Sequence, residues 1–158
     1  MTKHTISVLV ADQPGVLQRV CGLFGRRGYN IDSISVGRSE SEGCSRIILV
    51  TSCEERIADQ ICQQLNKLID VIQVKLLSKK PLLTRELMLI KCHAAAGARQ
   101  EILGLADTFR CSVIDVGAET MTIQVVGDRE KNTAFLQILR PFGIVEVTGT
   151  GVTAVNRG

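Results

Sequence analysis

TISVLVADQPGVLQRVCGLF, residues 5–24, changes its hydrophobic pattern at Asp12. Residues 5–11 are β-branched and apolar, which is typical of a largely buried strand. After the change, apolar residues recur at spacings of three and four, which predicts an amphipathic helix. Asp12 is placed to cap this helix, Pro14 suits its first turn, and Gly28 suits its end. The stretch therefore predicts a strand followed directly by a helix.

The next residues continue this pattern through residue 77. Residues 30–37 and 44–52 predict two strands that are separated by a polar turn. Residues 54–68 predict a second helix, and residues 71–77 predict a fourth strand. The order strand, helix, strand, strand, helix, strand is the split βαβ arrangement of ferredoxin-like domains.

The same order returns about 80 residues later, with predicted elements at 85–92, 97–109, 112–116, 120–126, 130–139 and 144–147. We therefore predict an α+β protein of two tandem ferredoxin-like βαββαβ domains. The domains span residues 1–77 and 84–158, and residues 78–83 form the linker. Domains of this size bury only about 60 to 65% of their unfolded surface, so we expect a homodimer. Gly149 and Gly151 are expected to lie in a flexible tail.

The composition argues against nucleic acid and membranes as partners. The 158 residues include 19 basic and 16 acidic side chains, and their net charge of +3 forms no clustered basic stripe. The strands at 44–52 and 120–127 carry none of the aromatic rings on which RNA-recognition domains stack bases. No apolar run approaches the roughly 18 to 20 residues of a membrane-spanning helix, and residues 1–10 do not resemble a signal peptide.

The sequence shows no pattern of residues that is typical of a catalytic or metal-binding site. The six cysteines form no C-x-x-C pair and no Cys/His cluster, so we expect reduced core residues and no metal site. The sequence contains neither of two glycine-rich nucleotide-binding motifs, G-x-x-x-x-G-K-[ST] and G-x-G-x-x-G. Cys92 and His93 are neighbours on a predicted strand, and their side chains should point to opposite faces. A catalytic function for this small protein remains an alternative only because the sequence does not show what surrounds the thiols.

Residues 12–17, DQPGVL, have the chemistry to bind a free amino acid. A helix N-terminus offers unpaired N–H groups and a partial positive charge, which suit a carboxylate. Gly15 places no side chain in the way, and the carboxylate of Asp12 suits an ammonium group. The same residues also form an ordinary capping turn. Asn30 likewise serves as a turn residue or as a ligand contact, because its amide both donates and accepts.

Longer segments of the sequence, beyond residues 12–17, resemble those of a known family. Residues 7–37, SVLVADQPGVLQRVCGLFGRRGYNIDSISVG, resemble the opening of the regulatory (small) subunits of acetolactate synthase, also called acetohydroxyacid synthase. The N-terminal part of these subunits is an ACT domain. The similarity continues through residues 45–46, 64–71, 85–91 and 151–158, so it covers essentially the full chain. The strings GLFxRRGYNI and RELMLIK are characteristic of this subunit.

The resemblance implies a non-catalytic protein that activates a catalytic (large) subunit and confers feedback inhibition by valine or another branched-chain amino acid. Thiamine diphosphate, Mg and FAD are then expected only on the catalytic subunit. The expected location is the cytoplasm, or a plastid if a transit peptide was removed. A free-standing ACT-type amino-acid sensor without a catalytic partner is the alternative.

The resemblance also assigns the effector-binding residues. Four loop positions match the segment that approaches the charged groups of the ligand, namely Asp12, Gly15, Val16 and Leu17. Asn30 and Ile31 match the part that the partner chain contributes. Val36 and Leu17 are the candidates for contact with an isopropyl group. The family often has asparagine at the position of Asp12, and an ionised Asp12 favours an ammonium group but repels a carboxylate. Residues 93–97, HAAAG, stand at the matching junction of the second domain, which is not expected to bind valine in the same way.

Overall fold

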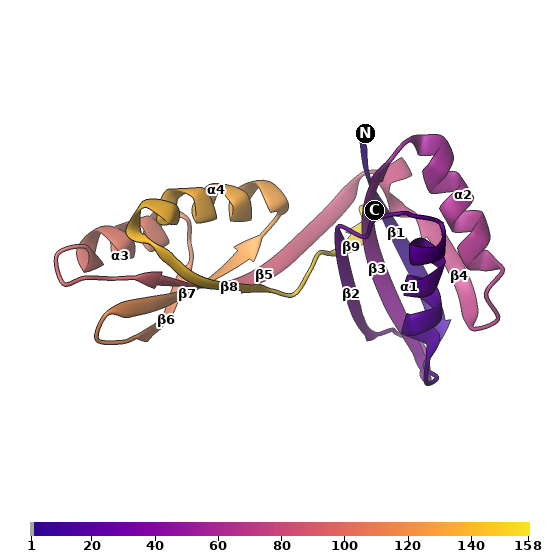
Figure 1. The fold of residues 1–158 in the computed structure, drawn as a ribbon, viewed down its shortest axis with the longest axis horizontal. Helices are drawn as coiled ribbons and strands as arrows, with labels where there is room; N and C mark the ends of the chain where they lie inside the picture. Colours follow the sequence, from indigo (N-terminus) through magenta and orange to yellow (C-terminus); the bar gives the residue numbers. More distant parts are fainter. Residues whose placement is uncertain (1) are drawn as a thin grey trace. The chain divides into compact units, whose positions relative to one another are not determined.

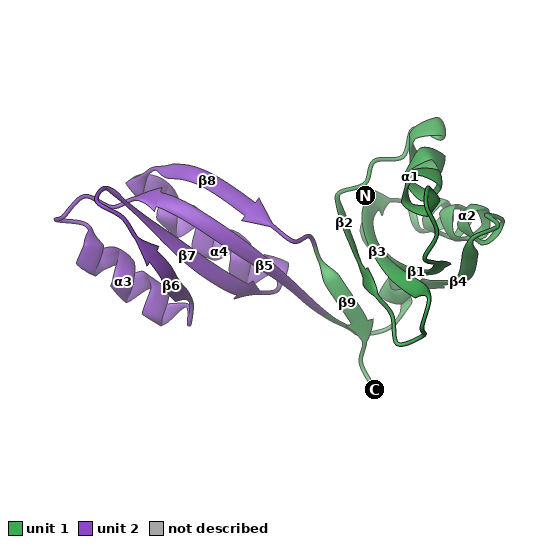
Figure 2. Ribbon diagram, turned by 90° about the horizontal axis from the view of Figure 1, so that it is seen from below, with its two compact units in different colours: residues 1–83, 152–158 green, residues 84–151 purple. Residues whose placement is uncertain are grey.

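The computed structural model describes residues 2–158, which divide into two compact units (Figure 2). Unit 1 joins the chain up to Leu83 with residues 152–158, and unit 2 contains Thr84–Gly151. Each unit has its own antiparallel sheet and its own buried core. The chain therefore passes between the units twice, once within a strand and once near its C-terminal segment.

Unit 1 contains a four-stranded sheet with the strand order β2-β3-β1-β4. Helices α1 and α2 lie on one face of this sheet (Figure 1). The elements are β1 (Thr2–Ala11), α1 (Val16–Arg26), β2 (Ser33–Arg38), β3 (Cys44–Cys53), α2 (Glu55–Asn66), β4 (Val71–Leu76) and the short 3-10 helix η1 (Leu77–Lys79).

Alternation along the two central strands of unit 1 produces its core. Ile6, Val8 and Val10 of β1 point to the helices, because successive side chains of a strand face opposite sides. Ile47 and Leu49 of β3 join them on the same face. The helices contribute the buried residues Val16, Val20, Leu23, Phe24, Ala58, Ile61 and Leu65. The strand and helix predicted from residues 5–24 thus form the centre of this unit.

Unit 2 repeats the arrangement with the strand order β6-β7-β5-β8, and α3 and α4 cover one face of the sheet. Its elements are β5 (Leu82–His93), α3 (Arg99–Thr108), β6 (Ser112–Val116), β7 (Thr120–Gly127), α4 (Arg129–Leu139), the 3-10 helix η2 (Arg140–Phe142) and β8 (Ile144–Gly149). Strand β5 begins two residues before the unit does. Both sheets have the strand order of a split βαβ fold, so the predicted fold class is confirmed.

The start of α1 differs from the prediction. Asp12 does not cap the helix: Gly15 occupies the N-cap position in the left-handed conformation, with φ +85°, and no side chain caps the helix. The Asp12 N–H group instead donates to the carbonyl oxygen of Gly43 at 2.9 Å, which ties the loop to the turn between β2 and β3. The capping pattern was misleading because a left-handed glycine moves the first helical turn three residues further along the chain.

The C-terminal segment also differs from the prediction. Instead of a flexible tail, residues 153–156 form a ninth strand, β9 (Thr153–Asn156), which pairs with β5. The Val152 N–H group donates to Ser33 Oγ at 2.8 Å, and Ser35 Oγ donates to the Val152 carbonyl oxygen at 2.8 Å. Asn156 Nδ2 donates to the Leu77 carbonyl oxygen at 2.8 Å. The predicted second domain, 84–158, therefore ends earlier as a compact unit, because residues 152–158 pack in unit 1.

The predicted linker at 78–83 is ordered structure in which η1 leads into β5. Leu77 and Leu82 pack with Ile48 and Ala154 in a small apolar cluster of unit 1.

A four-residue strand is too short to show a hydrophobic period, and this explains why sequence reasoning missed β9. Between residues 2 and 158 there is no helix of the length and apolar character needed to cross a membrane.

Candidate effector site

The loop that joins β1 to α1 is held from two sides. The Ala11 N–H group donates to the Asp70 carbonyl oxygen at 2.9 Å, on the turn between α2 and β4. The next N–H group, that of Asp12, binds Gly43 on the turn between β2 and β3. Residues 12–15 therefore leave the sheet between two fixed turns and enter α1 through the left-handed Gly15.

The first turn of α1 can bind an anion through its backbone. The Val16 N–H group donates to the Gln13 carbonyl oxygen at 3.3 Å, and no side chain caps the turn. The N–H groups that follow Val16 face the end of the helix, where the helix dipole places a partial positive charge. Neither Glu nor Asp occurs in this first turn. A ligand carboxylate is the group that this end of α1 suits.

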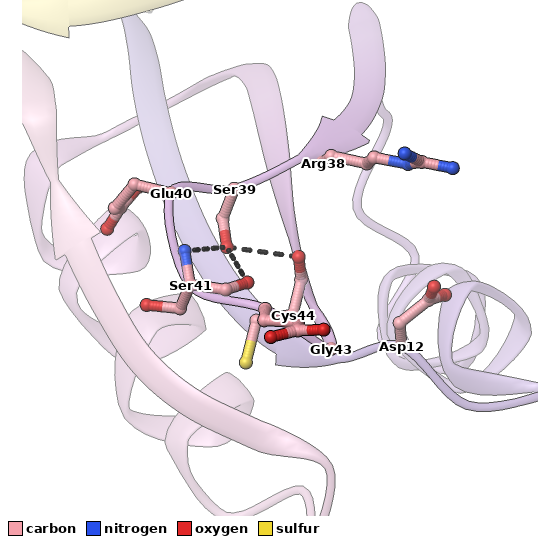
Figure 3. A pocket seen from close by; sticks show the side chains of 8 residues that line it. Asp12, Arg38, Ser39, Glu40, Ser41, Gly43 and Cys44 are labelled. Carbon is pink, nitrogen blue, oxygen red and sulfur yellow. Dashed lines mark hydrogen bonds between the residues drawn. The ribbon is translucent and has the colours of Figure 1, made fainter.

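Asp12 lines an open groove with the turn between β2 and β3 (Figure 3). Ser39 Oγ organises this turn, because it lies 3.1 Å from Ser41 N and 3.0 Å from the Cys44 carbonyl oxygen. Arg46 Nη1 contacts Glu40 Oε1 at 2.6 Å and lowers the pKa of the Glu40 carboxyl to about 2. The remaining lining residues are Arg38, Glu42 and Gly43.

The sequence alone does not reveal this groove. Residues 38–43 read only as a polar turn, because their composition does not show that the turn lies beside the β1–α1 loop. Pairing of Ala11 with Cys44 creates that proximity.

Asn30 is positioned by the end of α1 and by β3. Gly28 adopts φ +70°, and the Tyr29 N–H group donates back to the Phe24 carbonyl oxygen at 2.9 Å, which ends the helix in a Schellman motif. The Tyr29 ring meets the Phe24 ring edge-on, with centroids 6.4 Å apart. Thr51 Oγ1 donates to the Asn30 carbonyl oxygen at 2.7 Å. These contacts fix the backbone from which the Asn30 amide extends.

The amide group of Asn30 is oriented by Asp32. Asn30 Nδ2 donates to Asp32 Oδ1 at 3.1 Å, and Ser52 Oγ donates to Asp32 Oδ2 at 2.6 Å. The Ser52 hydroxyl is the largest influence that lowers the pKa of the Asp32 carboxyl, and Lys3, whose Nζ lies 3.5 Å from it, acts in the same direction. One of the two Nδ2 hydrogens is thus bound to Asp32, and Asn30 Oδ1 is the acceptor of this oriented amide, for which an ammonium group is a suitable donor.

The two parts of the predicted site lie at opposite ends of the sheet. The Asp12 loop follows Ala11, which pairs with Cys44, whereas Asn30 is bound to Thr51. Cys44 and Thr51 are seven residues apart on β3, a separation of about 23 Å at the rise of a strand. The structure does not bring Asp12 and Asn30 together in one chain, so a ligand that touches both requires a second chain.

The apolar residues of the predicted site divide into two groups. Val16 is a core residue with 4% of its side chain exposed, and Ile31 packs partly buried against the same core. Leu17 and Val36 are 45% and 49% exposed. Val16 therefore offers a ligand only its backbone, whereas Leu17 and Val36 present free apolar surface.

The matching junction of unit 2 is built differently. Helix α3 begins at Arg99, whose Nη2 donates to the carbonyl oxygens of Gly117 and Ala118 at 2.6 and 2.7 Å. Ala94, just after β5, is completely buried. This junction contains no counterpart of the Asp12 carboxylate or of the left-handed Gly15.

Four of the six thiols are poor nucleophiles in this environment. All six cysteines are free. Burial raises the pKa of the Cys62 thiol to about 11, and it also raises the pKa of Cys53, Cys92 and Cys111. These four side chains are therefore protonated at neutral pH, and the thiolate is the reactive form. Across residues 2–158 no group of three or more His, Cys, Asp or Glu side chains is arranged to hold a metal ion.

Comparison with known proteins places both halves of the chain in one family. Residues 6–73 match the model of the "AHAS small subunit-like ACT domain", and residues 85–158 match that of the "Small subunit of acetolactate synthase". A probable acetolactate synthase small subunit from Methanothermobacter thermautotrophicus is 48% identical over 98% of this chain and 93% of its own length. The chloroplastic acetolactate synthase small subunit 2 of Arabidopsis thaliana is 43% identical over 98% of this chain and 32% of its own length.

A solved structure agrees with these matches. The crystal structure of the acetolactate synthase small subunit from Thermotoga maritima superposes with a TM-score of 0.92 at 37% identity, and the alignment covers 100% of this chain and 99% of that one. The chain therefore belongs to the family of acetolactate synthase small subunits, and its N-terminal unit contains the ACT domain of that family.

Proposed function

We propose that this chain is a non-catalytic subunit that activates a thiamine-diphosphate-dependent acetolactate synthase and makes it sensitive to valine or another branched-chain amino acid. Family membership supports the role of a regulatory subunit with a catalytic partner. One observation carries the effector part of the proposal: an uncapped helix N-terminus and an oriented Asn30 amide stand at opposite ends of one sheet.

A homodimer unites these two ends. Strand β2 is an edge strand of its sheet, so a second copy can pair with it. If two copies of β2 pair antiparallel about a two-fold axis, the start of one strand lies beside the end of the other. Asn30 of one copy then approaches Arg38 and Asp12 of the other. The exposed Leu17 and Val36 belong to the helix and strand next to this edge.

A free amino acid has the groups that such a site requires. Its carboxylate is bound by the N–H groups of the first turn of α1, and its ammonium group donates to Asn30 Oδ1 of the other copy. The Asp12 carboxylate adds attraction for the ammonium group, and Leu17 with Val36 contacts a branched apolar side chain. Each group of the ligand thus meets a partner of complementary chemistry.

The regulatory mechanism follows from differential binding. Without ligand, the paired N-terminal units hold the catalytic subunit in its active arrangement. The amino acid binds a second arrangement of the pair more tightly and shifts the population toward it. A typical coupling of about 1 to 3 kcal/mol changes activity or affinity roughly 5- to 150-fold.

The proposal places all cofactor chemistry on the catalytic subunit. Thiamine diphosphate, Mg and FAD are expected there and not on this chain. The expected location is the cytoplasm, with a plastid as the alternative because a chloroplastic plant relative belongs to the same family.

The decisive experiment measures acetolactate formation by the cognate catalytic subunit with and without this chain, and with and without excess L-valine. Activation that valine reverses supports the proposal. Calorimetric binding of valine without any activation would favour a free-standing amino-acid sensor. The absence of both activation and valine binding would refute the proposed function.

A further inference from the structure

Asp70 holds one end of the β1–α1 loop directly and the other end through Arg19. It lies in the turn between α2 and β4, and its carbonyl oxygen accepts from the Ala11 N–H group at 2.9 Å, at the point where β1 ends. Its carboxylate accepts from Arg19 Nε at 2.8 Å, and it also binds Arg19 Nη2. The Arg19 N–H group in turn donates to the Gly15 carbonyl oxygen at 3.0 Å. One residue outside the loop therefore holds the residue before it and, through Arg19, the first turn of the helix after it.

The ion pair also fixes where the rest of the guanidinium lies. Nε and Nη2 are both bound to Asp70 Oδ2, so this edge of the Arg19 guanidinium faces the carboxylate and Nη1 points away from it. Nη1 lies against Gly15: a Cβ atom at that residue would be only 2.9 Å from it. The guanidinium thus closes one side of the left-handed turn, and its charge lies beside the N–H groups of the first helical turn.

The exposure of the pair argues for an effect on ligand binding more than on folding. The side chains of Arg19 and Asp70 are 46% and 17% exposed. Ion pairs at such positions contribute little to stability. Two N–H groups of Arg19, however, share one oxygen of Asp70 and hold the guanidinium at the turn, and loop orientation decides whether backbone N–H groups meet a ligand carboxylate.

We infer that Asp70, acting through Arg19, is a positioning residue that sets the affinity of the β1–α1 loop for the effector. The inference rests on the proposed function, because it concerns the regulation of the same site. It assigns a role to the α2–β4 turn, which contributes none of the residues predicted to bind the effector.

The test uses the reconstituted holoenzyme, with L-valine as the probe. Asp70→Asn and Arg19→Gln each remove the ion pair, and Asp70→Asn keeps the carbonyl contact to Ala11. Each variant should raise the valine concentration for half-inhibition roughly fivefold, a change of about 1 kcal/mol. The double variant should be no worse than either single one, because the two residues act as a unit. Activation without valine and the thermal midpoint should match those of the original chain.

Asp59→Asn provides the matched control. Asp59 Oδ1 lies 3.0 Å from Lys79 Nζ, so this variant removes another exposed ion pair of unit 1 that does not touch the loop. Its valine response should be unchanged. If both Asp70→Asn and Arg19→Gln are inhibited like the original chain while Asn30→Ala has lost inhibition, the inference is wrong and the site stands. If Asn30→Ala is inhibited normally, the proposed site itself fails. Should Asp70→Asn not fold, Arg19→Gln decides alone.

Discussion

Gly15 determines where the backbone donors of α1 point. Its φ of +85° is a conformation that residues with a Cβ atom rarely adopt, and it moves the start of the helix to Val16. Asp12 is thereby released from capping and stays at the groove beside the β2–β3 turn. A single backbone conformation thus frees both the carboxylate and the helix N-terminus for a ligand.

Gly15→Ala should therefore weaken effector binding and slightly destabilise the fold. The left-handed conformation costs an alanine about 1 kcal/mol, and the added Cβ atom displaces Arg19 Nη1. We expect a lower urea midpoint and a raised valine concentration for half-inhibition. Gly25→Ala is the control, because Gly25 lies within α1, has no atom within 4 Å of its ideal Cβ position and should gain stability. Equal behaviour of the two variants would contradict this account.

At the scale of elements, the sequence predicted all four α-helices and eight of the nine strands because these segments carry a clear hydrophobic period, but neither of the 3-10 helices η1 and η2. The Asp12 cap was mispredicted because the same residues suit either a cap or a left-handed turn. The effector residues came from a family resemblance and not from their spacing. Asp70 and Arg38 escaped notice because only the folded sheet brings their turns to the β1–α1 loop.

The opposite end of the same sheet predicts a dependence on pH. Ser52 of β3, Lys3 of β1 and Asn30 in the loop before β2 all contact the Asp32 carboxyl and lower its pKa. A carboxyl whose pKa is lowered by folding stabilises the protein above its unfolded pKa of about 3.9, and this contribution disappears as the pH falls through the lower folded value. Thermal midpoints of the original chain and Asp32→Asn should differ by a constant amount above about pH 5 and converge below about pH 4. A difference that does not change across this range would contradict the assigned contacts.

For the whole molecule, the main consequence of the geometry is that a ligand contacting both Asp12 and Asn30 needs two chains. Asp12 and Asn30 are separated by most of the length of β3. No rearrangement within one four-stranded sheet brings them together, because the register of β1 and β3 fixes both ends.

Mixing two variants whose inhibition by valine is impaired should therefore partly restore inhibition. Gly15→Ala damages the loop side and Asn30→Ala removes the amide side, so each homodimer lacks an intact site. A mixed dimer has one site built from the loop of the Asn30→Ala chain and from Asn30 of the Gly15→Ala chain. Co-expression should give a holoenzyme that valine partly inhibits, whereas mixing the two purified homodimers without exchange should not. Absence of any recovery on co-expression would point to a site within one chain.

Removing residues 152–158 should destabilise unit 1. The deletion exposes Ile48 and Leu77, which are 3% and 6% exposed, and removes the hydrogen bonds of Val152 and Asn156. The expected loss is about 2 kcal/mol, measured by urea unfolding. Deletion of residues 157–158 alone leaves β9 in place and should have a smaller effect. A chain that lacks β9 but keeps its full stability would contradict the packing of this strand.

The position of β9 has a consequence for synthesis on the ribosome. The N-terminal unit is the first to emerge, and domains generally fold in that order. Here its last strand is translated only after the whole of unit 2. Thr150 is bound to Leu87 of unit 2, and Val152 is bound to Ser33 and Ser35 of unit 1, so Gly151 alone separates the two attachments. A nascent chain that stops before Val152 cannot form the contacts with Ser33 and Ser35. The complete unit 1 therefore forms only after translation has reached β9.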